Sequence, residues 1–565
     1  MAYVITQPCC NDATCLEVCP VDCIRPTPAD PGFATAEMLH IDPGTCIDCG
    51  ACAEECPVDA IFAADELPEE HARYASVNAD WFDRHPLESS WDALEPGGRV
   101  TLPPDTTPLR VAIVGSGPAA CYAAADLIGR AGAAVEVEMF DRLPTPWGLI
   151  RAGVAPDHPG TKAITDVFRA TTSNPAFAFR LNVEIGADLS HDDLMAHHHA
   201  VIYAVGAAGD RRLGVPGEDF AGCHGATEFV AWYNGHPDRA DARFDLSGER
   251  VVIVGNGNVA LDVARILVSD PDELAATDIA DHALEALRAS NIREVVLLGR
   301  RGPAEAAYTS PELIALGRLP GVDVVVDALA FDEHARGAAG DDASDAATAL
   351  KTAVAAEYAE RPPTPGNRRI VLRYMVSPVV MLGEGRVEGV RIVHNALVDE
   401  DGVRRAEPTD RYESIETSLV LRAIGYRGTA VPGLPFDEDR GVIPNAGGRV
   451  ADPRTGAPLP GVYAAGWIKR GPSGVIGTNK RCAQETVAHL LDDAVAGRLV
   501  APTGNRDTLT ALLRARSPEV VDGEGWRAID AAERDRGRTQ GRPRTKFTDI
   551  ESMLAAASPG NLEVP

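Results

Sequence analysis

Residues 109–120, LRVAIVGSGPAA, run from a short apolar segment directly into a turn that contains two glycines. The alanine-rich segment 121–132 follows, so the pattern predicts a β-strand, a tight turn and an α-helix in succession. In such a turn Gly115 permits the tight bend, Gly117 lets a pyrophosphate approach the backbone, and the amides that open the helix favour its negative charge. The stretch therefore predicts a Rossmann-like dinucleotide-binding domain.

The next apolar segment, 134–140, ends in Asp141, a little farther from Gly115 than is usual for this motif. A carboxylate at the end of the second strand is placed to accept hydrogen bonds from the ribose hydroxyls of a dinucleotide. Glu138, inside the segment, is the less favoured alternative. We therefore expect Asp141 to bind the cofactor.

A second turn of the same kind lies farther along the chain, in the stretch 250–260, RVVIVGNGNVA. The strand that follows it, 294–298, leads into Arg300 and Arg301 instead of an acid. A carboxylate there would repel the 2′-phosphate of NADP, whereas paired guanidinium groups bind it through charge-assisted hydrogen bonds. Two solvated arginines at a strand end are the alternative, and the preceding dinucleotide turn disfavours it. The second turn is therefore expected to bind NADP.

Two dinucleotide turns in one chain indicate a flavoprotein in which an NADP domain is inserted into an FAD domain. The segment 461–480 supplies a strand and a glycine turn ahead of a helical stretch at 484–493, and we expect it to complete the FAD domain. The cysteines beyond the N-terminal region, Cys121, Cys223 and Cys482, are single. Because no CxxC pair accompanies the flavin, a disulfide-reductase mechanism is excluded.

Nine of the twelve cysteines lie between Cys9 and Cys56. One run has the spacing by which bacterial ferredoxins hold an iron–sulfur cluster: Cys46-x2-Cys49-x2-Cys52-x3-Cys56-Pro57. An upstream run repeats it with an aspartate in place of the second cysteine: Cys9-x2-Asp12-x2-Cys15-x3-Cys19-Pro20. A zinc ribbon needs only two CxxC pairs and would leave the longer run unexplained.

The repeat indicates a duplicated unit in which the fourth ligand of each run crosses to the other cluster. We assign a [4Fe-4S] cluster to Cys19, Cys46, Cys49 and Cys52. A second cluster is assigned to Cys9, Cys15 and Cys56. It is either [3Fe-4S], or [4Fe-4S] with a carboxylate oxygen from Asp12. Cys10 is a less favoured substitute ligand, and Cys23 is expected to pack as a small buried hydrophobe.

Composition restricts the remaining function classes. The formal net charge of −30 opposes binding to nucleic acid or to an anionic membrane, because both are polyanions. No window approaches the ~20 uninterrupted apolar residues of a membrane span, and the N-terminus lacks the pattern of a secretory signal. The segment from Met1 to Asp105 holds 20 acidic and only 4 basic side chains, which marks a separate acidic module. We expect a cytoplasmic monomer.

These patterns predict a fold class and its domain limits. An α+β ferredoxin-like iron–sulfur module occupies 1–95, and a linker occupies 96–108. An α/β flavoprotein with two dinucleotide-binding domains follows. Its Rossmann-like FAD domain is formed by 109–209 and 426–565, with the NADP domain inserted at 210–425.

Several stretches resemble adrenodoxin reductase and the bacterial ferredoxin–NADP reductases of that family. They are PTPWGLIRAGVAPDHPGTK (144–162), VIYAVGAAGDRRLGVPGED (201–219), VVIVGNGNVALDVARIL (251–267), LLGRRGPAEAAYT (297–309), RAIGYRG (422–428) and GVYAAGWIKRGPSGVIGTNK (461–480). The stretch 1–60 resembles bacterial ferredoxins of the seven-iron or eight-iron type. The fusion of both parts is similar to the mycobacterial two-domain type.

Carried over position by position, the resemblance implies two sets of cofactor contacts. FAD contacts would fall at Ala119, Asp141, Leu149, Trp467, Gly474, Val475 and Ile476. NADP contacts would fall at Arg211, Asn256, Gly257, Asn258, Val259, Arg300, Arg301, Glu312 and Gly474.

The resemblance also implies a catalytic residue. His158, in the PDHP motif at 156–159, matches a family histidine proposed to act near the flavin with a carboxylate partner, and a structural histidine is the alternative. Where relatives have ELRE after the arginine pair, this chain has Glu312-Leu-Ile-Ala315, so the second carboxylate is missing. The histidine run at 197–199 is expected to be a solvated helix end rather than a metal site.

The activity that the resemblance implies is electron transfer between NADPH and one-electron iron–sulfur carriers through FAD, with the attached ferredoxin module as relay. A flavin is needed because a hydride delivers two electrons together, which a cluster cannot accept. The external acceptor would be a ferredoxin or another one-electron carrier, for example in a cytochrome P450 chain.

Two competing hypotheses remain. One is an NADPH-oxidising, electron-feeding subunit similar to the small subunit of glutamate synthase. The stretches GVAPDHP and GWIKRGP favour the ferredoxin reductase instead. The other is a passive electron carrier with vestigial nucleotide folds, which the intact glycines and the arginine pair oppose.

Replacing both arginines, Arg300→Ala with Arg301→Ala, is expected to weaken the binding of NADPH but not that of NADH. Two charge-assisted contacts worth about 1.5–3 kcal/mol each would be lost, so the KM for NADPH should rise at least tenfold while that for NADH changes little. Steady-state kinetics with both nucleotides measure this. Equal effects on the two nucleotides would contradict the assignment.

Overall fold

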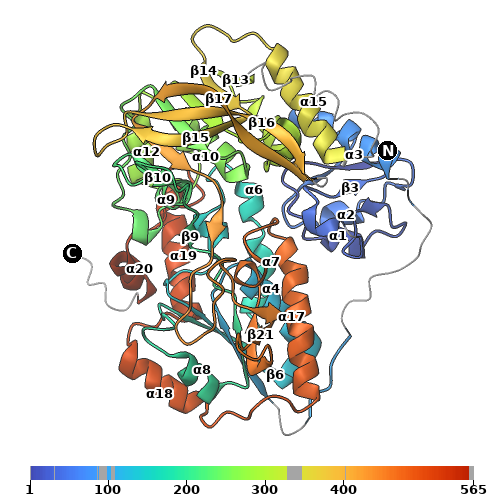
Figure 1. Cartoon of the computed structure of the whole chain (residues 1–565). Helices are drawn as coiled ribbons and strands as arrows, with labels where there is room; N and C mark the ends of the chain where they lie inside the picture. The colour runs from blue at the N-terminus through green and yellow to red at the C-terminus, as the bar shows by residue number, and fades with distance from the viewer. Residues whose placement is uncertain are drawn as a thin grey trace.

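The computed structural model describes residues 2–30, 32–85, 87, 98–103, 108–326, 346–400 and 403–558. Of the predicted linker at 96–108, residues 96–97 and 104–107 lie outside the described residues. Two large sheets and a small N-terminal module make up the described chain (Figure 1).

The first sheet collects strands from two distant parts of the sequence, in the order β20-β21-β22-β8-β5-β6-β7. Its N-terminal strands are β5 (Leu109–Val114), β6 (Val135–Asp141), β7 (Phe177–Leu181) and β8 (Ala200–Tyr203). Its C-terminal strands are β20 (Asn445–Ala446), β21 (Arg449–Ala451) and β22 (Pro458–Ala464). Strand β22 runs parallel to β8, with Val462 opposite Val201. The C-terminal part of the chain therefore completes the sheet that contains the first glycine turn.

Helices cover this sheet and carry its loops. Helix α4 (Pro118–Ala131) follows the first turn and packs against α17 (Thr478–Val495). The others are α5 (Leu149–Ala152), α6 (Pro159–Lys162), α7 (Thr165–Thr172), α8 (His191–His197), α16 (Trp467–Arg470), α18 (Arg506–Arg516), α19 (Gly523–Arg538) and α20 (Ile550–Ala557). The apolar side chains of α4 are buried in the core with those of β5.

The second sheet is parallel throughout, in the order β10-β18-β11-β12-β14-β13. Its strands are β10 (Cys223–Gly225), β11 (Arg250–Val254), β12 (Glu294–Leu298), β13 (Val322–Val326), β14 (Arg368–Arg373) and β18 (Leu419–Arg422). Its helices are α9 (Ala226–Tyr233), α10 (Asn258–Val268), α11 (Pro271–Leu274), α12 (Asp281–Arg288), α13 (Ser310–Leu316) and α15 (Ala346–Glu360). An antiparallel sheet of β15 (Val376–Leu382), β16 (Gly389–Glu400) and β17 (Val403–Glu416) is inserted between β14 and β18. Strands buried on both faces have the continuous apolar sequences of a parallel sheet.

The N-terminal module has the pseudo-twofold organisation expected of a duplication. Two short helices, α1 (Thr14–Glu17) and α2 (Ala51–Glu54), each start after a residue with positive φ. Strand β1 (Tyr3–Ile5) pairs with β4 (Ile61–Ala63), and β2 (Ile24–Arg25) pairs with β3 (His40–Ile41). The longer helix α3 (Arg73–Arg84) holds both halves together: the buried Asn78 side chain accepts from the amides of Ile5 and Ile41.

The module lies against the reductase portion, beside α15 and the N-terminal end of α17 (Figure 1). The predicted fold class, an α+β iron–sulfur module followed by a two-domain α/β flavoprotein, is confirmed. Within the described ranges, no helix combines the length and the apolar character needed to cross a membrane.

Candidate functional site

The first glycine turn leaves room for a pyrophosphate at the start of α4. Gly115 has φ +99°, and a Cβ there would collide with the carbonyl oxygen of Ala204 in the neighbouring strand segment. A Cβ on Gly117 would meet nothing within 4 Å. The first glycine therefore shapes the turn, whereas the second faces open space in front of the helix amides, as a bound pyrophosphate requires.

Asp141, at the end of β6, holds this turn in place. Its Oδ2 accepts from the Ser116 amide at 3.0 Å and from the Ser116 hydroxyl at 2.5 Å, and its Oδ1 accepts from the amide of Leu143. Burial raises the pKa of Asp141, and the hydrogen bonds from Ser116 offset part of that rise. The carboxylate lies at the turn, where a cofactor ribose would lie.

The alternative acid, Glu138, is occupied elsewhere. Arg180 forms an ion pair with it at 2.7 Å, and the Nε2 of His198 lies 3.1 Å from its other oxygen. Burial acts to raise the pKa of Glu138, but His198 and Arg180 outweigh it and lower the pKa to about 2. The expectation of a solvated histidine run was wrong for His198 and His199, which are buried; His199 Nδ1 accepts from the amide of Arg110.

Three segments from different parts of the chain meet at the first turn. A Cβ on Gly148, just before Leu149, would lie 3.0 Å from the Cα of Gly117. A Cβ on Gly466, just before Trp467, would lie 2.6 Å from the Cβ of Ala119. These close approaches bring the expected FAD contacts at 119, 149 and 467 to the same edge of the sheet, so the residues present fit FAD.

The remaining expected FAD contacts precede α17. Gly474 has φ +79°, and Val475 and Ile476 lead into the helix. The indole Nε1 of Trp467 donates to the carbonyl oxygen of Ser473 at 3.2 Å, which ties this loop to α16. The loop and the tryptophan therefore form one connected unit beside the flavin site.

The second glycine turn has the same construction. Gly255 has φ +121°, and a Cβ there would collide with the carbonyl oxygen of Ala423. A Cβ on Gly257 would meet only the Ala307 side chain, at 3.8 Å. Asn256 lies in this turn, and Asn258 and Val259 open α10. Asn258 Oδ1 accepts from the amide of Thr309 at 2.7 Å, so the turn is linked to the start of α13.

The guanidinium groups expected to bind NADP are available for an anion. Arg300 is exposed and Arg301 is half-buried, directly after β12. Arg211 is exposed, and its backbone amide donates to the carbonyl of Gly425. None of these three side chains forms an ion pair with the described residues. The residues present therefore fit a phosphorylated nucleotide.

His158 and Glu312 meet where the two nucleotide-binding domains join. The histidine Nε2 lies 4.0 Å from Glu312 Oε2, and both side chains are mostly buried. The buried Arg265 of α10 binds Asp157 at 2.6 Å and Asp262 at 2.7 Å, and lies 3.5 Å from Glu312. A ring nitrogen of His158 and one carboxylate oxygen each of Asp262 and Glu312 all lie within 4.8 Å of one another.

Two carboxyl groups of this network, Asp157 and Glu312, have pKa values shifted in opposite directions. Burial acts to raise the pKa of Asp157, but the Arg265 guanidinium outweighs it and holds the pKa below its usual value. Burial raises the pKa of Glu312, and His158 and Arg265 offset only part of that rise. Arg265 and Asp262 were not among the residues expected from the sequence. Their i, i+3 spacing on a predicted helix was the available signal.

The cysteines of the first expected cluster converge. A small cavity in the module is lined by Cys19, Cys46, Cys49 and Cys52. Four thiols from both halves of the repeat around one cavity fit a [4Fe-4S] cluster. Cys23 is buried as expected, but it also lines this cavity, with its Sγ 3.5 Å from that of Cys19.

The ligands of the second expected cluster lie on the side of the module that contacts the FAD domain. Cys9 and Cys56 pack against both the module core and the FAD-domain core, while Cys15 is buried in the module. Cys10 is buried among FAD-domain side chains. The structure thus separates the two sets of cysteines, one facing the flavoprotein and one facing away.

Asp12 faces the FAD domain. The hydroxyl of Tyr122, in α4, donates to its Oδ2 at 2.6 Å, and the Thr14 hydroxyl donates to its Oδ1. Lys480 Nζ donates to its backbone carbonyl at 3.2 Å. Both carboxylate oxygens therefore have hydroxyl donors.

Family models and similar proteins agree with this architecture. A 4Fe-4S binding domain model matches residues 39–62, and a pyridine nucleotide-disulphide oxidoreductase model matches residues 109–296. The "Probable ferredoxin/ferredoxin--NADP reductase" of Mycobacterium tuberculosis is 50% identical over 570 residues, covering 99% of this chain and 95% of that protein. The "NADPH-ferredoxin reductase FprA" of that organism is 47% identical over 459 residues, covering 79% of this chain and 98% of that protein. The solved structure of M. tuberculosis FprA in complex with NADPH has a TM-score of 0.75 and 45% identity, covering 80% of this chain and 99% of that chain.

The two glycine turns allow the cofactor assignments to be tested separately. Gly117→Ala should fold but retain less FAD, because its Cβ would enter the space in front of α4. Gly257→Ala should retain FAD while its KM for NADPH rises roughly tenfold, about 1.4 kcal/mol. Flavin absorbance per polypeptide and steady-state kinetics measure these effects.

Gly115→Ala is the matched control for the first turn. It should lower the thermal stability of the protein, because both its φ and the Ala204 carbonyl oppose a side chain. Normal FAD content in Gly117→Ala would contradict the placement of the pyrophosphate.

Proposed function

The chain belongs to the ferredoxin/ferredoxin–NADP reductase family, and on that premise we propose that its own ferredoxin module is the relay that takes electrons from the flavin after NADPH has reduced it. The observation that supports this is the contact of the Cys9–Asp12 segment with the FAD domain. Tyr122 donates to Asp12, and the amide of Gly477 donates to the carbonyl of Cys10 at 2.8 Å. The chain is a flavin-dependent oxidoreductase. FAD, when bound, takes up the two electrons of a hydride and releases them singly.

The residues of the second turn orient NADPH in this proposal. Arg300 and Arg301 hold the 2′-phosphate, because both guanidinium groups lack ion-pair partners among the described residues. Gly257 admits the pyrophosphate to the backbone amides of α10.

His158 is the proposed catalytic residue, with Glu312 as its carboxylate partner. Their 4.0 Å separation permits a charge interaction, and the Arg265 guanidinium lies 3.5 Å from the same carboxylate. Burial raises the pKa of Glu312, which makes this carboxyl group easier to protonate than an exposed one and suits it to holding a proton. The missing carboxylate at Ala315 leaves Glu312 as the partner for this role.

The second cluster is proposed to be [3Fe-4S]. The proposal gives it three thiol ligands, Cys9, Cys15 and Cys56, and is supported by the hydrogen bonds that both oxygens of Asp12 accept from Tyr122 and Thr14. A carboxylate is also a harder ligand than a thiolate and less suited to iron in a sulfide cluster. Asp12 thus serves the contact with the FAD domain.

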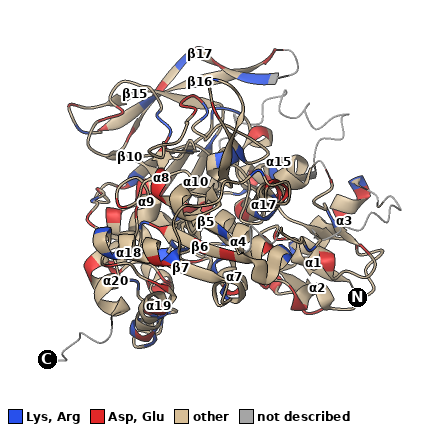
Figure 2. Ribbon diagram, turned by 90° about the horizontal axis from the view of Figure 1, so that it is seen from below, with Lys and Arg blue, Asp and Glu red and all other residues tan. Residues whose placement is uncertain are grey.

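Electrons are proposed to leave at the exposed edge of the first cluster. Cys49 is exposed, and the neighbouring Ile47 has 58% of its surface exposed. Red ribbon segments, which mark acidic residues, lie on and near α2 (Figure 2). The exposed acidic residues of this part of the chain are Asp48, Glu54, Glu55, Asp65 and Glu66. Electrostatic complementarity favours an external one-electron carrier with a basic contact surface.

A cytoplasmic location is part of the proposal. None of the twelve cysteines, all of which lie in the described part of the chain, forms a disulfide. Thiolate ligands of iron must remain reduced until the clusters are assembled, and the cytosol keeps thiols in that state.

An anaerobic titration with NADPH tests the proposed function. Successive additions should bleach the flavin absorbance, remove the EPR signal of the oxidised [3Fe-4S] cluster and produce the signal of the reduced [4Fe-4S] cluster, because the module receives electrons from the flavin. Protein reduced by dithionite supplies the reference signals. Flavin bleaching without any cluster reduction would contradict the relay.

Asp12→Cys tests the type of the second cluster. Air-handled wild-type protein should show the EPR signal of an oxidised [3Fe-4S] centre beside a silent oxidised [4Fe-4S] centre. Restoring the thiolate should convert it into a second [4Fe-4S] cluster after reconstitution and reduction, and Asp12→Asn, the matched control, should keep the [3Fe-4S] signal. Two oxygen-resistant [4Fe-4S] clusters that persist in Asp12→Ala would mean that another ligand is present, with Cys10 first to examine.

A further inference from the structure

We propose that the ferredoxin module is also part of the NADPH-oxidising site, in which Glu37 positions the helix that carries Glu312 and the segment of Gln7 and Pro8 packs beside the loop of His158. This inference rests on the proposed function, because it assumes that Glu312 acts there with His158. It assigns to the module a second role beside electron relay.

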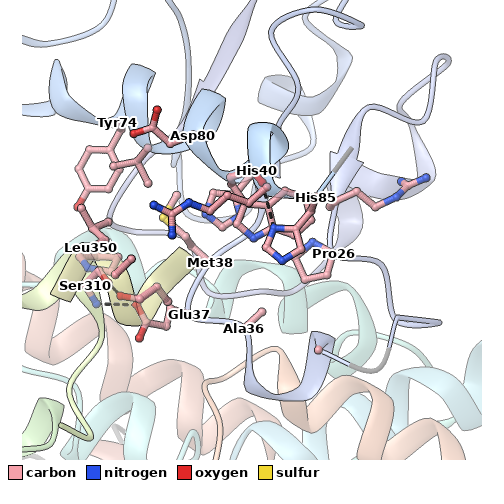
Figure 3. Close-up of a pocket in the computed structure, with 18 of the residues that line it drawn as sticks. Pro26, Ala36, Glu37, Met38, His40, Tyr74, Asp80, His85, Ser310 and Leu350 are labelled. Carbon is pink, nitrogen blue, oxygen red and sulfur yellow. Dashed lines mark hydrogen bonds between the residues drawn. The ribbon is translucent and has the colours of Figure 1, made fainter. Parts of the chain in front are cut away.

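Glu37 anchors the start of the helix that carries Glu312. Its Oε2 accepts from the backbone amide of Ser310, the first residue of α13, at 2.6 Å. Its Oε1 pairs with Lys351 of α15 at 2.5 Å. Figure 3 shows the Glu37 side chain directed from the module toward Ser310, at the cavity that both parts of the chain line. Both charged side chains of the Glu37–Lys351 pair are mostly buried, so this contact is well shielded from solvent.

Gln7 precedes Pro8 in the segment of the module that packs beside the loop of His158. Its side chain acts to lower the pKa of Glu312, against the larger, opposite effect of burial. An amide N–H donor favours the charged form of a carboxylate. The module therefore supplies one of the groups that determine the charge of this residue.

The module also contacts the loop that carries His158. A Cβ on Gly160, two residues after the histidine, would lie 3.4 Å from the carbonyl oxygen of Val58 and 3.8 Å from the Cβ of Pro8. Both members of the His158–Glu312 pair thus stand on short elements, α6 and α13, against which the module packs. A small displacement of the module would change their separation.

Several charged or titratable groups face Glu312 from the elements packed around it. His158 and Arg265 favour its ionised form, while Asp262 opposes it. The buried Tyr74, on α3 of the module, interacts with it electrostatically. Because Gln7 acts to lower the pKa of Glu312, loss of its side chain should move the titration of Glu312 to higher pH.

The test uses the complete protein and a small one-electron acceptor, ferricyanide, which takes electrons from the flavin without requiring the clusters. The pH profiles of kcat and kcat/KM for NADPH are measured for the wild type, Gln7→Ala, Glu37→Ala and Glu37→Gln. Glu312→Gln identifies the inflection that belongs to Glu312. Iron and FAD contents establish that each variant retains its cofactors.

We expect Gln7→Ala to move that inflection upward by about half a pH unit or more. Glu37→Ala should shift the same inflection and lower kcat/KM at least threefold. Glu37→Gln should restore most of the wild-type behaviour, because its amide oxygen still accepts from Ser310. The matched control is Glu357→Gln, which removes the exposed pair between Arg73 of the module and Glu357 of α15 without touching α13, and should leave the profile unchanged.

The outcomes separate this inference from the proposed function. Wild-type profiles in both Gln7→Ala and Glu37→Ala, with an altered profile in Glu312→Gln, would overturn the inference and leave the function intact. An unaltered Glu312→Gln enzyme would overturn both the inference and the role of Glu312. A shift as large in Glu357→Gln as in Glu37→Ala would show that general loosening of the module is the cause, and would likewise overturn it.

Discussion

The buried guanidinium of Arg265 is the interaction on which the arrangement of the site depends. It comes from the NADP-binding part and binds Asp157 from the loop between β6 and β7 of the other sheet, as well as Asp262 of its own helix. Removing one partner of a buried ion pair costs about 3–5 kcal/mol, because the remaining charge stays buried and uncompensated. The two nucleotide-binding parts are therefore held in an orientation that keeps this pair intact, and that orientation brings His158 to Glu312.

The ferredoxin module is placed by contacts of the same kind. Asp12 meets Tyr122, Glu37 meets Lys351, and Arg73 meets Glu357, so one acidic module contacts both nucleotide-binding parts. The contacts with Tyr122 and Lys351 are buried and resist screening by salt, whereas the pair with Glu357 is exposed and contributes less. Other acidic side chains of the module near Cys49, such as Asp48 and Glu54, are exposed. Charged and polar contacts thus attach the module to both nucleotide-binding parts while part of its acidic surface stays open to solvent.

Several residues acquired their roles only through contacts between distant segments. The place of Asp12 in the cysteine repeat left open whether its carboxylate binds iron. Its contact with Tyr122, 110 positions away, supports the proposal of a [3Fe-4S] cluster without this ligand. Glu138 and Asp141 were both candidates to bind the ribose. Because Glu138 is paired with Arg180 and His198, Asp141 is the better candidate. His198 and His199 looked like a solvated helix end until strand pairing placed them in the interior.

The sequence by itself determined the two strand–turn–helix units, the arginine pair after the second of them, and the cysteine spacing of a duplicated cluster module. These features are local: the conformation of glycines, short runs of apolar residues and the spacing of ligands all act within about 30 residues. Only the tertiary structure decided that Arg265 joins the two nucleotide-binding parts and that Glu37 reaches α13. The physical reason is that a side chain's charge and partners depend on which distant segments are buried against it, and spacing along the chain does not specify that.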